Sequence, residues 1–294
     1  MRDFTHFLAI DWSGAKGERH KGIAVAIADA RGGAPVLVAP PARGWSREDI
    51  LVLLREDVPE GALVGMDLGI SLPFADAGAF FPGWQESPQG ARALWALIDD
   101  ICASDPHLEC GSFVTHGEAS RYFRHSKEQI GDRFHLPGAA TREGRFRRAE
   151  LAQRAQGVRP VSNFNLVGAA QVGKSSLTGM RLLHRLEGRA SIWPIDPLPA
   201  SGPVLVEMYT SIAARGGGVG AGRTKLRSYE QLNAALAELS SPQIKGTGPI
   251  DDHSSDALVT AAWLRMIAPQ PACWNPSGLD PQIARTEGWT FGAV

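Results

Sequence analysis

Two short apolar segments that each end near an aspartate constrain the fold more than any other feature of this sequence. The first spans residues 6–12 and contains Asp11, and the second spans residues 62–67 and ends at Asp67. A fully apolar segment of this length, reached through a helix, is typical of a buried strand with a parallel neighbour. We therefore expect both segments to be strands of one sheet in an α/β fold.

The residues between these two strands predict a hairpin and a helix. Residues 22–28 and 35–38 are apolar segments on either side of a glycine-containing turn. Together with residues 6–12 they fit a three-stranded antiparallel meander. A helix is expected to begin at Ser46, because Asp49 stands three residues later, where its carboxylate can close a capping box.

After residue 160 the sequence again alternates between expected helices and strands. Strands are expected at residues 191–195 and 204–209, and the second of them contains Glu207. The expected amphipathic helices span residues 175–186, 228–239 and 254–267. This pattern predicts an α/β domain with a mixed five-stranded sheet flanked by helices.

Residues 74–160 differ in composition from the segments on either side. A helix is expected at residues 90–102, and the remainder is polar and poor in strand signals. From residue 116 to residue 160 there are ten Lys or Arg against five Asp or Glu. We interpret residues 74–160 as a largely helical, basic insertion into a core made of residues 1–73 and 161–294.

A cluster of basic residues lies near the end of this insertion. It consists of Arg142, Arg145, Arg147 and Arg148, with Phe146 among them. Guanidinium groups bind phosphates and an aromatic ring can stack on a base, so the cluster is a candidate contact for a nucleic acid or a nucleotide. The alternative is that Glu143 and Glu150 pair with these arginines on a solvated helix face.

The composition excludes several classes of protein. The chain has 294 residues and a net charge of −1, with 30 Lys and Arg against 31 Asp and Glu, so it is not polycationic as a whole. Three cysteines, without the spacing of metal ligands, argue against a disulfide framework or a zinc ribbon and favour a reducing compartment. There is no apolar run of the roughly 18 residues that a membrane helix needs, and no signal-peptide core. A cytoplasmic protein is expected, and the oligomeric state stays open.

Four acidic residues stand where a metal site would need them. Asp11 and Asp67 end strands, and Glu207 lies in a late strand. Asp256 lies in the first turn of the last expected helix, three residues after His253. Clustered carboxylates suit Mg²⁺, and two such ions roughly 4 Å apart can hydrolyse a phosphodiester. Each acid taken singly has a simpler explanation, as a strand-end residue or as a favourable charge near a helix N-terminus.

The order of these motifs resembles the RNase H-like superfamily, especially the branch that contains the Holliday-junction resolvases. In that branch a His-x-x-Asp pair on the last helix meets the aspartate of the first strand, and His253 and Asp256 have this form. More closely, the sequence is similar to an uncharacterised family of predicted RNase H-like nucleases. The matching segments are residues 10–14, 65–73, 206–209 and 252–257.

The resemblance implies a Mg²⁺- or Mn²⁺-dependent phosphodiesterase that acts on nucleic acid. The expected metal ligands are Asp11, Asp67 and Asp256, and Glu207 and His253 are ligand or general-base candidates. The residues expected to contact substrate are Ser13, Lys174, Arg145, Arg147, Arg148, Lys225 and Arg227. Two alternatives stay open. One is a nucleotide-binding or phosphoryl-transfer protein of the actin-like ATPase type, because residues 11–14 also resemble its phosphate hairpin. The other is a non-catalytic binding protein on the same fold.

Residues 168–175 match the P-loop pattern G-x-x-x-x-G-K-[ST] letter for letter. A P-loop follows a buried strand and opens a helix, but residues 162–167, with two asparagines, are a poor central strand. We therefore expect a loop beside the acidic residues, with Lys174 near phosphate, rather than a nucleoside triphosphatase. Lys225 and Arg227 lie on a second basic loop, which follows the strand of Glu207 and can reach the same edge.

Overall fold

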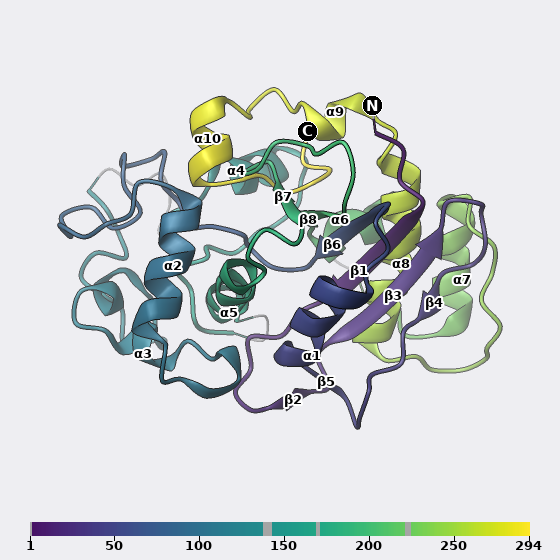
Figure 1. Ribbon diagram of the computed structural model, residues 1–294, viewed down its shortest axis with the longest axis horizontal. Helices are drawn as coiled ribbons and strands as arrows, with labels where there is room; N and C mark the ends of the chain where they lie inside the picture. The colour runs from purple at the N-terminus through teal and green to yellow at the C-terminus, as the bar shows by residue number, and fades with distance from the viewer. Residues whose placement is uncertain (1, 138–142, 169–170, 221–224) are drawn as a thin grey trace.

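The fold is a mixed α/β arrangement around a six-stranded sheet, seen in a computed structural model that describes residues 2–137, 143–168, 171–220 and 225–294 (Figure 1). In sheet order the strands are β4 (Val36–Leu37), β3 (Ala24–Asp29), β1 (His6–Asp11), β6 (Ala62–Met66), β8 (Val204–Glu207) and β7 (Ser191–Trp193). The expected number of five strands is wrong, because the short segments β4 and β7 both pair and each forms an edge of the sheet.

The strand directions agree with the sequence pattern. β1, β3 and β4 form the predicted antiparallel meander, and β6 pairs parallel to β1. β8 pairs parallel to β6, and β7 pairs parallel to β8. A separate two-stranded sheet, β2 (Arg19–His20) with β5 (Trp45–Ser46), was not expected from the sequence. The carboxyl ends of β1, β6 and β8 therefore lie at one edge of the main sheet.

Side chains alternate between two hydrophobic cores, one on each face of the sheet. Leu8 and Ile10 of β1 face the first core, whereas Phe7 and Ala9 face the second. The helices that contribute to the first core are α1 (Arg47–Val52), α2 (Ala91–Ile101) and α5 (Val172–Arg185). Those that contribute to the second are α6 (Thr210–Gly216), α7 (Tyr229–Glu238) and α8 (Asp252–Ile267). The result is a sheet covered by helices on both faces (Figure 1).

Helix α1 begins where the capping box predicted. The Asp49 amide donates to Ser46 Oγ at 2.9 Å, and the Ser46 amide donates to Asp49 Oδ2 at 2.9 Å. The helix continues directly into a π-helical turn, η1 (Leu53–Asp57). The shorter helices without an individual prediction from the sequence are α6 and, in addition, η2 (Pro106–Leu108), α3 (Gly111–Thr115), η3 (Ala119–Tyr122), α4 (Arg148–Ala155), α9 (Pro271–Trp274) and α10 (Pro281–Thr286).

Residues 74–160 do not build a core of their own. Leu94, Phe113 and Tyr122 are fully buried and belong to the same cluster as Leu8 and Ile10 of β1. Most of the buried part of this segment packs onto that face of the sheet, whereas Ala149 of α4 joins the second core.

The three cysteines are free thiols and all are buried. Burial raises the pKa of Cys102 to about 12 and that of Cys110 to about 11, so both are inert thiols at neutral pH. Within the described ranges there is no helix both long and apolar enough to cross a membrane.

Candidate active site

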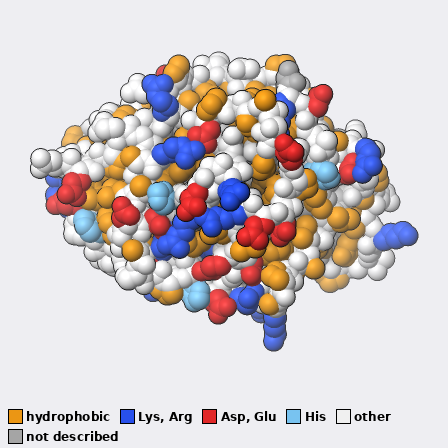
Figure 2. Space-filling view, in the orientation of Figure 1, with side chains coloured by type: hydrophobic (Ala, Val, Ile, Leu, Met, Phe, Trp, Pro, Cys, Tyr) orange, Lys and Arg blue, Asp and Glu red, His pale blue; other side chains and the backbone are white. Residues whose placement is uncertain are grey.

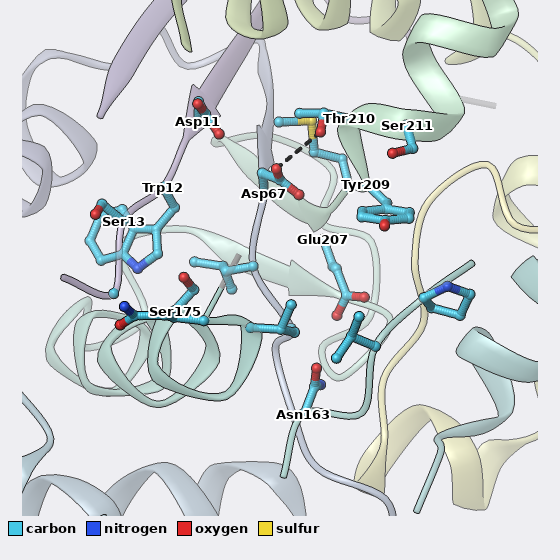
Figure 3. Close-up of a pocket in the computed structure, with 18 of the residues that line it drawn as sticks. Asp11, Trp12, Ser13, Asp67, Asn163, Ser175, Glu207, Tyr209, Thr210 and Ser211 are labelled. Carbon is cyan, nitrogen blue, oxygen red and sulfur yellow. Dashed lines mark hydrogen bonds between the residues drawn. The ribbon is translucent and has the colours of Figure 1, made fainter. Parts of the chain in front are cut away.

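The parallel strands β1 and β6 end side by side and bring two aspartates together. Ile10 pairs with Met66, and the Asp67 amide donates to the Ile10 carbonyl at 3.0 Å. Asp11 is the last residue of β1, and Asp67 directly follows β6. Both side chains point into a cavity at this edge of the sheet (Figure 3).

Helix α8 brings His253 and Asp256 to the same edge. Its N-terminus is capped by Asp251, whose Oδ1 accepts a hydrogen bond from the Ser254 amide at 2.9 Å. The helix packs along β1 and β3, so its first turn meets the end of β1. His253 Nδ1 lies 2.6 Å from Asp11 Oδ2, and the buried Asp256 forms an ion pair with Lys225.

Burial and neighbouring carboxylates change the ionisation of two of the three aspartates, Asp67 and Asp256. Burial, and then the charges of Asp11 and Asp256, raise the pKa of Asp67 well above its usual range. Burial also raises the pKa of Asp256 to about 6, with a contribution from Asp11, although the Lys225 ammonium opposes this change. Asp11 and Asp256 are therefore near enough to Asp67 for their charges to act on it.

Two basic side chains, His253 and Lys225, already bind aspartates of this cluster. The hydrogen bond to Asp11 raises the pKa of His253 above its usual value, which favours the imidazolium form. Burial lowers the pKa of Lys225, but Asp256 outweighs burial and raises it, so Lys225 is charged. Asp67 has a neutral partner instead, because Thr210 Oγ1 donates to its Oδ2 at 3.2 Å (Figure 3).

A ready-made metal site is not formed by these side chains. Within the described parts of the chain, no three His, Cys, Asp or Glu side chains are grouped so that they could hold a metal ion. Asp11 is hydrogen-bonded to His253, and Asp256 accepts a hydrogen bond from Lys225. The carboxylate donors are of the type that Mg²⁺ and Mn²⁺ take. Lys225, whose side chain is 46% exposed, occupies Asp256 Oδ2, so an ion that takes this oxygen must displace the ammonium.

Glu207 lies at the same edge but has no free oxygen. Its Oε2 accepts from Arg147 Nη1 at 2.7 Å and from the Ile70 amide at 2.8 Å. Its Oε1 accepts from Arg147 Nη2 at 2.6 Å and from Thr290 Oγ1. A carboxylate accepts about four hydrogen bonds, so Glu207 is saturated. This corrects its expected role as a ligand or base, because it serves as the buried partner of Arg147.

The arginine cluster is mostly interior, which corrects the expectation that it contacts phosphate. Arg147 is 1% exposed and bridges Glu150 and Glu207. Arg145 is 2% exposed and binds Asp76 together with three backbone carbonyls. Among the three arginines of the cluster that the structure describes, only the Arg148 side chain reaches solvent.

The remaining expected basic contacts are unevenly placed. Arg227 is exposed, and its Nε lies 3.8 Å from Asp252 Oδ1. Arg142 falls outside the described residues. Figure 2 shows acidic and basic side chains interspersed on the face that it displays, without an extended positive region there.

The cavity at this edge has a volume of about 490 Å³. Of the expected site residues, those that line it are Asp11, Ser13, Asp67, Arg147, Glu207, Lys225 and His253. Lys174 is not among the described residues that line it, and its ammonium instead lowers the pKa of the nearby Cys110 thiol, against the dominant effect of burial. The base of the Lys174 side chain lies against Gly14, where a Cβ atom would stand 2.8 Å from Lys174 Cβ, so its expected position near phosphate stays a prediction.

The P-loop pattern does not have the structure of a P-loop. Residues 162–168 form no strand, and only Asn165 makes an isolated bridge, to Arg124. Residues 169 and 170 lie outside the described chain. The prediction that a central strand is missing before this loop is confirmed.

Several cavity residues were not singled out from the sequence. Tyr209 and Thr210 stand two and three residues after the end of β8, so a search of the residues just beyond each strand could also have found them. Asn163 and Gln153 come from segments without any local signal and reach the cavity through tertiary packing alone.

Gly14 permits the close contact between the loop after β1 and helix α5. A Cβ atom at Gly14 would stand 2.3 Å from the Ser175 amide nitrogen and 2.5 Å from the Lys174 carbonyl carbon. We expect Gly14→Ala to reduce the free energy of unfolding by about 1–3 kcal/mol, because backbone must move to admit the methyl group. Gly33→Ala is the matched control, since a Cβ there meets nothing within 4 Å. Urea titrations of both variants test this, and equal midpoints would contradict the assigned contact.

Comparison with known proteins adds no relative to this picture: no family model, curated protein or solved structure matches the chain.

Proposed function

We propose that the protein is a divalent-metal-dependent phosphodiesterase that cleaves nucleic acid and has an RNase H-like fold. The observation that carries the proposal is the gathering of Asp11, Asp67 and Asp256 at one edge of the sheet, where burial and the neighbouring carboxylates raise the pKa values of Asp67 and Asp256. The antiparallel meander followed by parallel β6 and β8, with α8 across β1, supports the fold assignment. A cytoplasmic location belongs to the same proposal.

Asp11, Asp67 and Asp256 would hold Mg²⁺ or Mn²⁺ once Lys225 has left Asp256. The ion would supply an activated water and would stabilise the leaving oxygen. Within the chain, Asp11 orients the His253 ring through Nδ1 and favours its protonated form. His253 lines the cavity, so it can hold a proton beside a bound phosphodiester.

The test is cleavage of single-stranded, duplex and four-way-junction nucleic acids in Mg²⁺ or Mn²⁺, with EDTA as the blank. We expect Asp67→Asn to lower the cleavage rate by at least about 100-fold, because even second-shell substitutions around a metal cost 10–100-fold. Asp57→Asn is the control, since Asp57 is exposed and lies outside the cavity lining. Equal rates for parent and Asp67→Asn, or cleavage that persists in EDTA, would refute the proposal.

One observation favours a second candidate, a nucleotide-binding protein of the actin-like type. Asp11, Ser13 and Gly14 all line the cavity, as a phosphate hairpin would. Tight ATP binding by a parent protein that cleaves no nucleic acid would select this candidate.

A further inference from the structure

The cavity extends beyond the aspartates, and its second end is lined by residues that the proposed chemistry does not use. This end, which we call the amide pocket, consists of Gln153, Pro160, Val161, Asn163 and Tyr209. In the view of Figure 3, Glu207 lies between the side chains of Tyr209 and Asn163, on the side away from Asp11. The cavity therefore offers contacts to a part of the substrate other than the reacting phosphate.

Gln153 directs a fixed carbonyl oxygen at the amide pocket. Its Nε2 donates to Thr290 Oγ1 at 2.8 Å, and Thr290 Oγ1 in turn donates its only proton to Glu207. Thr290 can therefore only accept from Gln153, which fixes the nitrogen of this amide on the Thr290 side. Gln153 is 3% exposed and lines the cavity. No described residue donates to its Oε1, and this oxygen is not sealed from solvent, so it faces the cavity.

Asn163 provides a second oxygen in the same way. Its Nδ2 donates to the Ser71 carbonyl at 2.9 Å, which fixes the orientation of this amide, and no described residue donates to its Oδ1. Glu150 stands three residues before Gln153 on α4 and shares its face of the helix. Each Glu150 carboxylate oxygen accepts from Arg147 and keeps a lone pair. The polar groups that these side chains leave for a ligand are therefore acceptors.

Tyr209, Pro160 and Val161 give the amide pocket flat and apolar walls. The Tyr209 ring is half-buried, lines the cavity and packs against no other aromatic ring of the described residues. An aromatic face that is left open in this way can stack on a nucleobase. The pocket thus combines a stacking surface with hydrogen-bond acceptors held in fixed positions.

We propose that the amide pocket holds a nucleobase with an exocyclic amino group, stacked on Tyr209 and hydrogen-bonded to the carbonyl oxygens of Gln153 and Asn163. The inference rests on the proposed function and names the part of the substrate that is recognised beside the aspartates. Adenine and cytosine present an amino donor where thymine presents a carbonyl oxygen. Acceptors alone cannot pair with that oxygen, so the pocket selects against thymine.

The test is the affinity of fluorescently labelled DNA tetramers of adenine, cytosine or thymine nucleotides, measured by anisotropy in EDTA so that no metal-dependent cleavage occurs. We expect the adenine and cytosine tetramers to bind the parent about tenfold more tightly than the thymine tetramer, which leaves the acceptors unpaired. Tyr209→Ala should weaken binding of the adenine and cytosine tetramers about tenfold or more, because the stacking surface is lost. Tyr209→Phe is the matched control, since it keeps the ring and should retain the affinity.

Gln153→Met tests the acceptor separately from the stacking. The substitution removes one carbonyl oxygen at similar volume, so the preference over thymine should fall to about threefold or less. Gln129→Met is the matched control, since Gln129 is exposed and lies outside the cavity lining. Thermal melts establish that each variant is folded. The Tyr209 pair decides the proposal even if Gln153→Met, which also loses the bond to Thr290, does not fold.

Free adenosine identifies the source of the base. Tighter binding of the adenine tetramer than of adenosine supports recognition within a strand, and equal binding supports a free nucleoside, provided that Tyr209→Ala weakens both. Equal affinity for the three tetramers, binding of none of them, or a Tyr209→Ala protein that binds like the parent overturns the pocket even if the parent cleaves nucleic acid. The expected preference in a protein that cleaves nothing keeps the pocket and removes the nuclease.

Discussion

Replacement of Arg147 by methionine is expected to lower the free energy of unfolding by about 3–5 kcal/mol, the usual result of breaking a buried ion pair from one side. Arg147 is the cation between Glu150 and Glu207, and both carboxylates are at most 3% exposed. Without it, two buried acids lose their partner at once. Chemical denaturation at pH 7 measures the effect.

The neighbouring arginine gives the control for this experiment. The Arg148 side chain is exposed, and within the described chain only its backbone amide makes a hydrogen bond, which it donates to Glu287. Arg148→Met is therefore expected to change stability by no more than about 0.5 kcal/mol. The double variant Arg147→Met with Glu207→Gln should recover part of the loss, because it removes one uncompensated charge. An Arg147→Met protein as stable as Arg148→Met would show that this network does not stabilise the fold.

Replacement of Asp67 by asparagine is expected to stabilise the metal-free protein at neutral pH. Burial and the charges of Asp11 and Asp256 disfavour the ionised form of Asp67, and the substitution removes that charge while keeping the shape. A carboxyl whose pKa is raised by one unit costs about 1.4 kcal/mol when ionised, so a rise in Tm of several degrees is expected. The same variant should lose the stabilisation that Mn²⁺ gives the parent.

The dependence on pH has a definite sign. The folded-state pKa of Asp67 is raised, so the folded protein holds this proton at pH values where the unfolded chain has released it. The contribution of Asp67 to the free energy of unfolding is therefore complete below about pH 4, where both states hold the proton. It is lost as the pH rises through the folded-state pKa, because the buried carboxyl must then ionise. Asp256, with its pKa raised to about 6, acts in the same direction. The stability difference between Asp67→Asn and the parent should grow with pH, and a difference that shrinks would contradict the assigned electrostatics.

The acidic edge was predictable because its determinants are local. An aspartate inside or directly after an apolar strand can be recognised from a few residues, as for Asp11 and Asp67. The parallel pairing of β1 and β6 then places both at one edge without further information. The His-x-x-Asp spacing supplied the third element, since the first turn of α8 lies across the end of β1.

The arginine cluster was not predictable in the same way. Its several arginines in a short stretch are typical of an exposed, phosphate-binding segment. No neighbouring residue indicates that Arg147 pairs with Glu207, which lies in a strand 60 residues later. The start of α5 was missed because Gln171, in a left-handed conformation with φ of 39°, stands where Ser, Thr, Asp or Asn usually marks a helix start. Both cases depend on tertiary contacts that no local window contains.

The contacts of Glu287 and Thr290 can form only late in synthesis, because both residues lie near the C-terminal end of the chain. The Glu287 carboxylate accepts from the amides of Phe74, Ala75 and Arg148, and Thr290 accompanies Arg147 on Glu207. Glu207, which lines the cavity, is thus hydrogen-bonded to a C-terminal segment that is synthesised long after β1, β6 and β8. A nascent chain can pair those strands while residues 287–290 are still in the exit tunnel. Until then Arg147, Glu150 and Glu207 stay hydrated, and their network is completed only after residues 287–290 leave the tunnel.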